Sequence, residues 1–424
     1  MKILLIGSGG REHAIASTLI KSKNVHLFAL PGNPGIAKIA QIVPLNIKNH
    51  QDVSDFCTNN SIDLVVIGPE QPIADGLSDY LRSAGINVFA PSRSAAQLET
   101  SKLFAKQFMQ KYGIPTARSC AFDKSQKQEA LDYIRKGEFP VVIKADGLAA
   151  GKGVVVATTS DEAIQAIEEM FSGSFGSAGE KIVVEEFMQG EEASIFAITD
   201  GNNFVTLAPA QDHKRILDGD KGKNTGGMGA YCPAPIVTPE VLDKVNSQII
   251  EPTLQGMAAE GLPYIGCLYV GLMINNGNPK VVEYNCRFGD PETQAVLSVF
   301  EGDFAELLLS AAKGNLNVSA IKNINQGFAT CVVLASKGYP DKYETGFEIT
   351  GLDNISDNII VYHAGTKEID GKIFTNGGRV LGVTSLGATL KESRENAYRA
   401  VSKIHFQNMY CRSDIAAKGI KNSN

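Results

Sequence analysis

The alternation of short apolar runs with amphipathic segments in the first hundred residues constrains the fold more than any other feature of this chain. Apolar runs of strand length occupy residues 2–6, 25–30, 62–67 and 88–90, with helix-like stretches such as residues 11–21 between them. Strands that alternate with helices form parallel sheets covered by helices. Pro91 and Ser92 then precede a long helical stretch over residues 94–111, so we place a domain boundary there.

The pattern changes in the middle of the chain, where strands predominate. Two apolar runs at residues 141–144 and 154–157 flank a glycine-rich segment, which predicts an antiparallel hairpin with a mobile tip. Other strand-like runs lie at residues 181–185, 193–199, 205–208, 264–274 and 280–284, and helical stretches lie at residues 161–171 and 239–260. A smaller block from about residue 326 has strand-like runs at 329–335, 359–363 and 380–385 and a helix at 390–404. The sequence therefore predicts an α/β protein with an α+β middle.

Composition excludes several classes of protein. The 424 residues are 43% hydrophobic and 20% charged, as in soluble proteins of roughly two or three domains. A formal net charge of −6 argues against a general nucleic-acid binder. The seven cysteines are scattered, which argues against a disulfide framework and a zinc site. No uncharged apolar stretch reaches about 18 residues, so no membrane span is expected. The short N-terminal apolar run does not resemble a signal peptide, so we expect a cytoplasmic protein.

A glycine turn, Gly7-Ser8-Gly9-Gly10, separates the first predicted strand from the first helix. Backbone N–H groups at such a turn attract phosphate or carboxylate groups. A dinucleotide fingerprint would require glycine in place of Glu12 and an acidic residue after the second strand, where Pro31 stands. A tight packing turn and an anion site therefore remain the two main interpretations, and a dinucleotide site is disfavoured.

The second glycine loop, residues 147–153, contains Gly151-Lys152 but is not a Walker A motif. Gly153 follows the lysine instead of Ser or Thr, and Asp146 occupies the first glycine position. Lys144 ends the apolar strand before the loop. A lysine is costly to bury, so we expect its ammonium group to reach an anion or a carboxylate.

An acid, an amide and an arginine occupy three alternate positions around residue 285. Glu283 and Asn285 share one face of the predicted strand, with Arg287 continuing it, while Val282 and Tyr284 point the other way. A carboxylate and a carboxamide oxygen suit Mg²⁺ or Mn²⁺ that also binds substrate phosphates. The alternative is a solvated sheet face. The charged string Gln211-Asp212-His213-Lys214-Arg215 alone is typical of a solvated loop.

Taken in order, these segments resemble the phosphoribosylamine–glycine ligase family of the ATP-grasp superfamily over nearly the whole chain. The matching strings are Gly7-Ser8-Gly9-Gly10-Arg11-Glu12-His13-Ala14, Pro31-Gly32-Asn33-Pro34-Gly35, Gly68-Pro69-Glu70, Lys144-Ala145-Asp146-Gly147-Leu148-Ala149-Ala150-Gly151-Lys152-Gly153, Gln211-Asp212-His213-Lys214-Arg215, residues 224–231, Asn285-Cys286-Arg287-Phe288-Gly289-Asp290-Pro291-Glu292-Thr293 and Gly377-Gly378-Arg379-Val380-Leu381. The resemblance implies a Rossmann-like N-terminal domain over residues 1–99, an ATP-grasp domain over 100–322 with a mobile lid at about 117–189, and a small α+β C-terminal domain over 323–424.

The reaction implied by the resemblance joins glycine to 5-phosphoribosylamine at the expense of ATP, through glycyl phosphate, in purine biosynthesis. The partners expected are these small molecules and Mg²⁺ or Mn²⁺, without nucleic acid or membrane, on a monomer. The protein would act by positioning, by charge neutralisation and by keeping water from the acyl phosphate.

The resemblance also implies a role for each site residue. Lys102 and Lys144 would hold the ATP phosphates, beneath a loop that includes Gly147, Gly151, Lys152 and Gly153. The backbone of Glu185-Glu186-Phe187-Met188 would read adenine, and Glu192 would bind the ribose hydroxyls. Glu283 and Asn285 would bind the metal, with no acid offered by the preceding strand at residues 270–273.

The remaining implied roles concern the two other substrates. Arg287 would neutralise the transferring phosphoryl group, and Asp212 and Asp290 would hold the glycine ammonium or orient the amine. Gly9, Gly10, Gly378 and Arg379 would bind the phosphate of phosphoribosylamine. Two other hypotheses remain: another ATP-grasp carboxylate–amine ligase or carboxylase, and a dinucleotide-dependent oxidoreductase or nucleotide-binding regulator.

Overall fold

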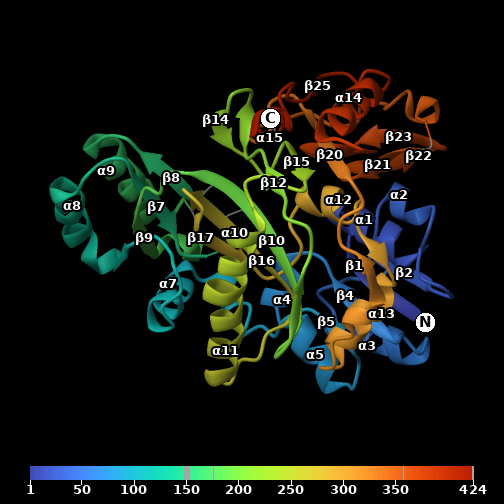
Figure 1. The fold of residues 1–424 in the computed structure, drawn as a ribbon, viewed down its shortest axis with the longest axis horizontal. Helices are drawn as coiled ribbons and strands as arrows, with labels where there is room; N and C mark the ends of the chain where they lie inside the picture. Colours follow the sequence, from blue (N-terminus) through green and yellow to red (C-terminus); the bar gives the residue numbers. More distant parts are fainter. Residues whose placement is uncertain (148–152, 175, 357, 423–424) are drawn as a thin grey trace.

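The computed structural model describes residues 1–147, 153–174, 176–356 and 358–422. Figure 1 shows the N-terminal unit in blue at the lower right, the C-terminal unit in red above it, and a separate unit around β6–β9 at the left. No helix in these described ranges is long and apolar enough to cross a membrane.

The N-terminal unit is a parallel sheet with strand order β3-β2-β1-β4-β5. Its strands are β1 Lys2–Gly7, β2 His26–Pro31, β3 Gln41–Ile42, β4 Leu64–Ile67 and β5 Val88–Phe89, and its helices are α1 Gly10–Leu19, α2 Pro34–Ala37, α3 His50–Asn59, α4 Glu70–Ala74 and α5 Leu77–Ser83. Leu4 and Ile6 belong to one apolar cluster, while Ile3 and Leu5 belong to another. Both faces of β1 are therefore buried, as the continuous apolar run predicts.

The helical stretch predicted over residues 94–111 is in fact broken. It forms α6 Gln97–Thr100 and α7 Lys102–Lys111. Ser101 between them is extended (φ −135°, ψ 110°), and its hydroxyl accepts a hydrogen bond from the N–H of Phe104. Ser101 therefore caps α7, and Lys102 becomes its first residue.

The β6–β9 unit has an apolar core of its own. It is an antiparallel sheet of strand order β6-β9-β7-β8, covered by two helices. Its elements are β6 Ser119–Asp123, β7 Val141–Ala145, β8 Val154–Ala157, β9 Lys181–Glu186, α8 Lys127–Lys136 and α9 Ser160–Glu169. Strands β7 and β8 pair antiparallel, so the predicted hairpin is confirmed.

The central antiparallel sheet has the order β11-β10-β16-β17 and lies between the other units in Figure 1. Its strands are β10 Glu191–Asp200, β11 Phe204–Thr206, β16 Ile265–Asn275 and β17 Asn278–Asn285. The helical stretch predicted at residues 239–260 comprises α10 Pro239–Val245 and α11 Glu251–Ala259, joined by a π-helical turn at Asn246–Ile250. Nearby elements are α12 Glu292–Val296, α13 Phe304–Ala312, the hairpin of β13 Arg215–Leu217 and β14 Lys221–Asn224, and the pair β18 Glu301–Gly302 and β19 Ile321–Asn323.

The C-terminal sheet includes strands from two parts of the chain. Strands β12 Gln211–Asp212 and β15 Gly229–Cys232 from the middle join β20 Phe328–Ser336, β24 Arg379–Gly387, β21 Ile359–His363 and β25 Met409–Tyr410. The other elements are β22 Thr366–Ile369, β23 Lys372–Thr375, α14 Leu390–Val401 and α15 Ala417–Asn422. This shared sheet brings the segment around Asp212 against the C-terminal unit.

Candidate active site

One cavity of about 860 Å³ is lined by residues from every unit of the molecule. Most of the residues singled out in the sequence lie on its walls: Lys102, Lys144, Gly147, Gly153, Glu185, Asp212, Glu283, Asn285, Arg287, Asp290 and Arg379. Gly9, Gly10, Glu186, Phe187, Glu192 and Gly378 are not among the lining residues. Gly151 and Lys152 lie outside the described residues.

Lys102, Lys106 and Lys144 line the cavity where α7 meets the β6–β9 unit; we call them the lysine cluster, and two of the three share one carboxylate. The ammonium groups of Lys106 and Lys144 lie 3.1 and 3.0 Å from the same Glu185 oxygen, Oε2. Lys102 Nζ donates to the carbonyl of Gly147 at 2.8 Å. Lys144 therefore reaches a carboxylate, one of the two partners predicted for it. With three ammonium groups and one carboxylate, the cluster has an excess of positive charge.

Burial changes the acidity of this cluster. It lowers the pKa of Lys106 to about 8, although the Glu185 carboxylate opposes the shift. Burial also lowers the pKa of Lys102, against the charge of Glu283. The sequence analysis missed Lys106, which lies one helical turn after Lys102 on α7; that spacing is the signal that predicts a shared face. It also missed the side chain of Glu185, assigning a role only to its backbone.

The start of the glycine loop is bound to the first turn of α7. The Asp146 carboxylate accepts from the N–H of Leu103 at 3.1 Å and from the Ser101 hydroxyl at 3.3 Å. A carboxylate at a helix N-terminus is stabilised by the exposed N–H groups. Gly147 has φ +142°, a conformation that L side chains rarely adopt. The break at Ser101 thus fixes both Lys102 and the loop entrance.

The predicted adenine hinge lies at the end of β9. Glu186 pairs with Arg118 at 2.8 Å and with Lys280 at 3.4 Å, and Phe187 is 41% exposed. The Glu192 carboxylate pairs with Lys214 Nζ. These side chains lie beside the cavity rather than on its walls.

Glu283 and Asn285 both line the cavity, as does Arg287, so the predicted shared face is confirmed. The prediction that Val282 points the other way is wrong. Gly271 pairs with Glu283 and Leu272 with Val281, which leaves Val282 as the extra residue of a β-bulge. Val281 and Tyr284 therefore face the core, while Val282 lines the cavity and its carbonyl accepts from Lys144 Nζ at 3.1 Å.

The Glu283 and Asn285 side chains have no hydrogen bond or ion pair with another described residue, so their oxygens remain available in the cavity. Two hard oxygen donors suit a cation that completes its shell with phosphate oxygens and water, as Mg²⁺ does. No group of three or more His, Cys, Asp or Glu placed to hold a metal occurs within the described ranges. The acid–amide pair fits a metal shared with a substrate, rather than one held by protein alone.

Arg287 is held by two carboxylates that sequence reasoning did not assign. Its guanidinium lies 3.0 Å from Glu99 and 3.3 Å from Glu70. Burial would lower the pKa of Arg287, but these two carboxylates raise it. Glu99 also accepts from the N–H of Cys286 at 2.6 Å, and burial raises the pKa of its carboxyl. Arg287 is therefore charge-compensated and fixed in position.

Asp212 lies near a lysine and two acids. Lys214 Nζ is 3.6 Å from Asp212 Oδ1 as well as paired with Glu192. Burial raises the pKa of the Asp212 carboxyl against the charge of Lys214, and Glu292 and Glu192 add to the rise. Glu292, which was quoted but not assigned in the sequence, is buried and accepts from Tyr269 Oη at 3.0 Å.

Arg379 crosses from the C-terminal unit to Asp290. One guanidinium nitrogen lies 3.0 Å from Asp290 Oδ2, and another donates to the Asp290 carbonyl at 2.7 Å and to the carbonyl of Gly226. Burial would raise the pKa of Asp290, but Arg379 lowers it. Gly378 packs on the ring of Tyr339, which itself lines the cavity.

The Glu12 side chain fills the first glycine turn, residues 7–10. The N–H of Gly9 donates to Glu12 Oε2 at 2.6 Å, and a Cβ on Gly7 or Gly68 would overlap the Glu12 side chain. A Cβ on Gly10 would lie 2.7 Å from Gln294 Nε2. Glu12 therefore fills the turn and accepts the N–H that we predicted for an anion; a bound phosphate at this turn would have to use other donors.

Comparisons with known proteins cover nearly the whole chain. Family models of phosphoribosylglycinamide synthetase match residues 1–99 (N domain), 100–293 (ATP-grasp domain) and 329–418 (C domain). Proteins named phosphoribosylamine–glycine ligase from Rhizobium meliloti and Chlorobaculum tepidum are each 49% identical, with 99% of this chain and 99% and 100% of theirs covered.

Solved structures agree with these matches. A phosphoribosylamine–glycine ligase from Thermotoga maritima is 37% identical, with a TM-score of 0.86 over 98% of this chain and 100% of that one. The biotin carboxylase domain of Hydrogenobacter thermophilus 2-oxoglutarate carboxylase, with MgADP bound, shares the fold at 15% identity and a TM-score of 0.72, over 96% of this chain and 91% of that one. The resemblance drawn from the sequence strings is confirmed: the chain belongs to the phosphoribosylglycinamide synthetase family and has its N-terminal, ATP-grasp and C-terminal domains.

Proposed function

We propose that this protein is an ATP-dependent ligase that joins glycine to 5-phosphoribosylamine, the second step of purine biosynthesis. The observation that carries the proposal is a single cavity lined by the lysine cluster, the Glu283–Asn285 pair and Arg379. Such a cavity can hold a triphosphate, a carboxylate and a second phosphate ester together. The full-length similarity to proteins of this name supports the choice of substrates.

The reaction proceeds in two steps. The γ-phosphoryl group passes from ATP to a carboxylate oxygen of glycine, giving ADP and glycyl phosphate. The amine nitrogen of phosphoribosylamine then attacks the glycyl carbonyl carbon, the carbon–oxygen bond to phosphate breaks, and the nitrogen loses a proton. The products are glycinamide ribonucleotide and phosphate. Most of the rate enhancement comes from holding the reactants and neutralising their charge.

ATP binds along the lysine cluster. Lys102, Lys106 and Lys144 neutralise its phosphates, while the loop bounded by Gly147 and Gly153 closes over them and excludes water. The backbone at residues 185–187 reads adenine, and Glu192 binds the ribose hydroxyls after releasing Lys214. The buried pairing of Lys106 and Lys144 with Glu185 supports this assignment, because it fixes both ammonium groups before ATP arrives.

Glu283 and Asn285 hold Mg²⁺ or Mn²⁺, whose contribution is to neutralise phosphate charge. Arg287, fixed by Glu70 and Glu99, donates to the transferring phosphoryl group and to the glycine carboxylate. Asp212 and Asp290 bind the glycine ammonium or orient the amine. Arg379 and Gly378 receive the phosphate of phosphoribosylamine beside Gly9 and Gly10, with donors other than the Gly9 N–H, which Glu12 holds.

The functional units that we assign are residues 1–99, 100–322 and 323–424, with the lid at about 117–189, in a cytoplasmic monomer. The independent core of the β6–β9 unit supports a lid that moves as one body.

The decisive experiment is to measure ADP release and glycinamide ribonucleotide formation with each substrate omitted in turn. We expect ADP only when glycine and freshly prepared phosphoribosylamine are both present. ADP release that does not depend on glycine but increases with bicarbonate would contradict this function and indicate a carboxylase. Binding of NAD(H) without ATP turnover would replace it with a dinucleotide-dependent activity.

A further inference from the structure

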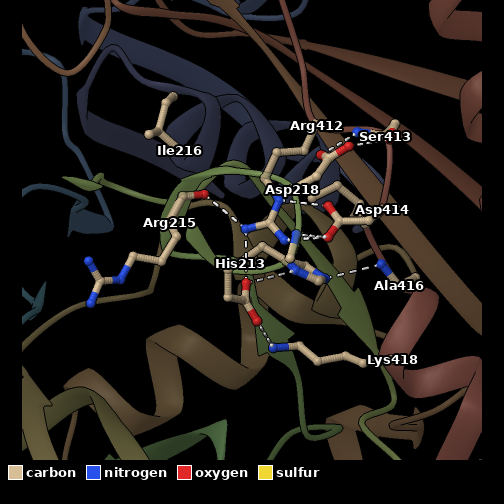
Figure 2. Close-up of polar contacts among 12 residues, drawn as sticks. His213, Arg215, Ile216, Asp218, Arg412, Ser413, Asp414, Ala416 and Lys418 are labelled. Atoms are coloured by element: carbon tan, nitrogen blue, oxygen red, sulfur yellow. Dashed lines mark hydrogen bonds and ion pairs between the residues drawn. The ribbon is translucent and has the colours of Figure 1, made fainter. Parts of the chain in front are cut away.

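Arg412 is a fully buried arginine outside the cavity, with 0% of its side chain exposed. Figure 2 shows its guanidinium between the carboxylate of Asp414 and the backbone of Arg215. It binds both oxygens of Asp414 at 2.7 Å, and one nitrogen donates to Asp220 and to the Arg215 carbonyl, each at 2.9 Å. A bidentate guanidinium–carboxylate pair fixes distance and direction.

The same C-terminal segment, residues 410–418, binds the β13–β14 hairpin at several further points. Asp218 accepts from the N–H of Ser413 at 2.9 Å and from its hydroxyl. The N–H of Gly219 donates to Asp414 at 2.8 Å. The Lys418 ammonium reaches Asp220 at 3.0 Å. We call these contacts, together with Arg412, the clasp.

Outside the clasp, the hairpin is held by an ion pair between the exposed side chains of Lys223 and Asp341 at 2.8 Å, and among the described residues it has no apolar packing. None of its residues belongs to an apolar cluster of the described structure, and Leu217 is 48% exposed. Its turn contains Gly219 and Asp220 at φ +68° and +53°, which restricts the backbone but provides no packing. Because the hydrophobic effect contributes so little here, polar contacts with the clasp determine where the hairpin lies.

The hairpin is flanked on both sides by residues of the cavity wall. Lys214 and Asp212 precede β13, and Asn224 ends β14; all three line the cavity. His213, between the two cavity residues, faces the other way, and its Nε2 accepts from the N–H of Ala416 at 3.1 Å, as Figure 2 shows. Alternation along an extended segment thus presents Asp212 and Lys214 to the substrates and His213 to the clasp.

We propose that the clasp, together with the hydrogen bond from Ala416 to His213, is a positioning device that holds Asp212 and Lys214 in register with the substrates, without touching the substrates itself. The inference rests on the proposed ligase function. It assigns a role in the reaction to residues that lie near the C-terminus and about 200 positions from the hairpin that they bind.

The experiment compares Arg412→Ala with Asp220→Asn, which keeps the shape of the turn. The control is Arg399→Ala, at an exposed arginine of α14 whose side chain donates to Asn396 on the same helix. We expect Arg412→Ala to lower kcat/KM for glycine roughly tenfold to a hundredfold and Asp220→Asn roughly threefold to tenfold. ATP affinity is expected to stay within about threefold of the parent, because the lysine cluster is untouched. Arg399→Ala is expected to match the parent.

Two measurements separate positioning from a simple loss of stability. Guanidinium at about 10 mM is expected to restore part of the activity of Arg412→Ala, whereas sodium at equal ionic strength is not. The effects of Arg412→Ala and Asp212→Asn on kcat/KM are expected to be less than additive, because the first acts through the second. Parent-like kinetics with only a lower Tm, or full additivity, would overturn the proposal.

Hydrogen exchange tests the clasp without relying on catalysis. Amides of residues 213–224 are expected to exchange faster in Arg412→Ala than in Arg399→Ala, with β10 and β16 unchanged. Unchanged exchange in the hairpin would overturn the clasp. A parent protein that lacks glycine-dependent ADP release would instead overturn the proposed function, so the two failures are distinguishable.

Discussion

The two charged walls of the cavity use their cations in different ways. On the α7 wall, which we call the lysine wall, Lys106 and Lys144 share one carboxylate, Glu185, and Lys102 binds a carbonyl, so the ammonium groups outnumber the carboxylate paired with them. On the part of the cavity that we call the arginine wall, each arginine is paired: Arg287 with Glu70 and Glu99, and Arg379 with Asp290. An excess of positive charge attracts a polyanion, whereas paired guanidinium groups offer fixed directions with little net charge. The lysine wall is thus suited to strong attraction of a triphosphate, and the arginine wall to orientation of smaller groups.

The largest effect is expected from Glu283→Ala, which removes the acid beside the lysine wall, where its charge acts on Lys102. Under the proposed function this carboxylate would be one of the two protein ligands of the cation, so we expect kcat to fall about a thousandfold or more. Steady-state ADP release measures this, with circular dichroism to confirm the fold and Glu240→Ala, an exposed acid on α10, as control. Activity within about tenfold of the parent would remove the metal assignment.

Lys144→Ala tests the lysine wall. Loss of one charge-assisted contact, about 1.5–3 kcal/mol, is expected to raise KM for ATP roughly tenfold to a hundredfold.

Arg287→Lys on the arginine wall is expected to lower kcat with a smaller change in KM for ATP, because a lysine cannot engage two carboxylates in the same geometry. Lys136→Ala, on the surface of α8, is the control. Equal changes in KM for ATP from both walls would show that the distinction between them is wrong.

Arg379→Ala tests whether the second wall recognises a different phosphate. We expect KM for phosphoribosylamine to rise about tenfold, because one charge-assisted contact is lost, while KM for ATP changes less than about threefold. Initial rates with each substrate varied separately measure the two constants. A change confined to ATP would mean that the phosphate of phosphoribosylamine binds elsewhere.

Much of the fold follows from local patterns. The apolar runs predicted β1, β2, β4 and β5 within a few residues, because strands buried on both faces are continuously apolar. The Ser101 break and the Val282 bulge were missed, since a cap and an extra residue leave no mark on an apolar pattern. The joining of β12 and β15 to the C-terminal sheet was also beyond local reasoning, because β15 pairs with β20, which lies about 100 residues further along the chain.

The candidate site divides in the same way. Glu283, Asn285 and Arg287 could be grouped from the sequence because strand alternation places them together. Lys106 could have been found from its helical spacing to Lys102. Glu99 could not, because its partner Arg287 lies 188 positions away, and no local spacing encodes such a pair. The occupied N–H of Gly9 likewise became visible only when Glu12 was seen to fold back onto it.

The smallest expected effect separates the two walls by acidity. Burial lowers the pKa of Lys106 to about 8, while carboxylates raise the pKa of Arg287 and Arg379. The charged form of Lys106 is complete well below pH 8 and is lost above it, so KM for ATP is expected to be flat to about pH 7.5 and to rise roughly threefold to tenfold by pH 9. The negative charge of bound ATP favours the protonated form of Lys106. The rise in KM for ATP is therefore smaller than the fall in the charged fraction of Lys106 alone would give. Lys106→Met is expected to show a higher KM for ATP at pH 7 with a flatter profile. KM for phosphoribosylamine has no such step, because guanidinium groups stay charged throughout this range. A flat ATP profile in the parent protein, or the same rise in the Lys106→Met variant, would show that Lys106 does not provide the titrating charge of the lysine wall.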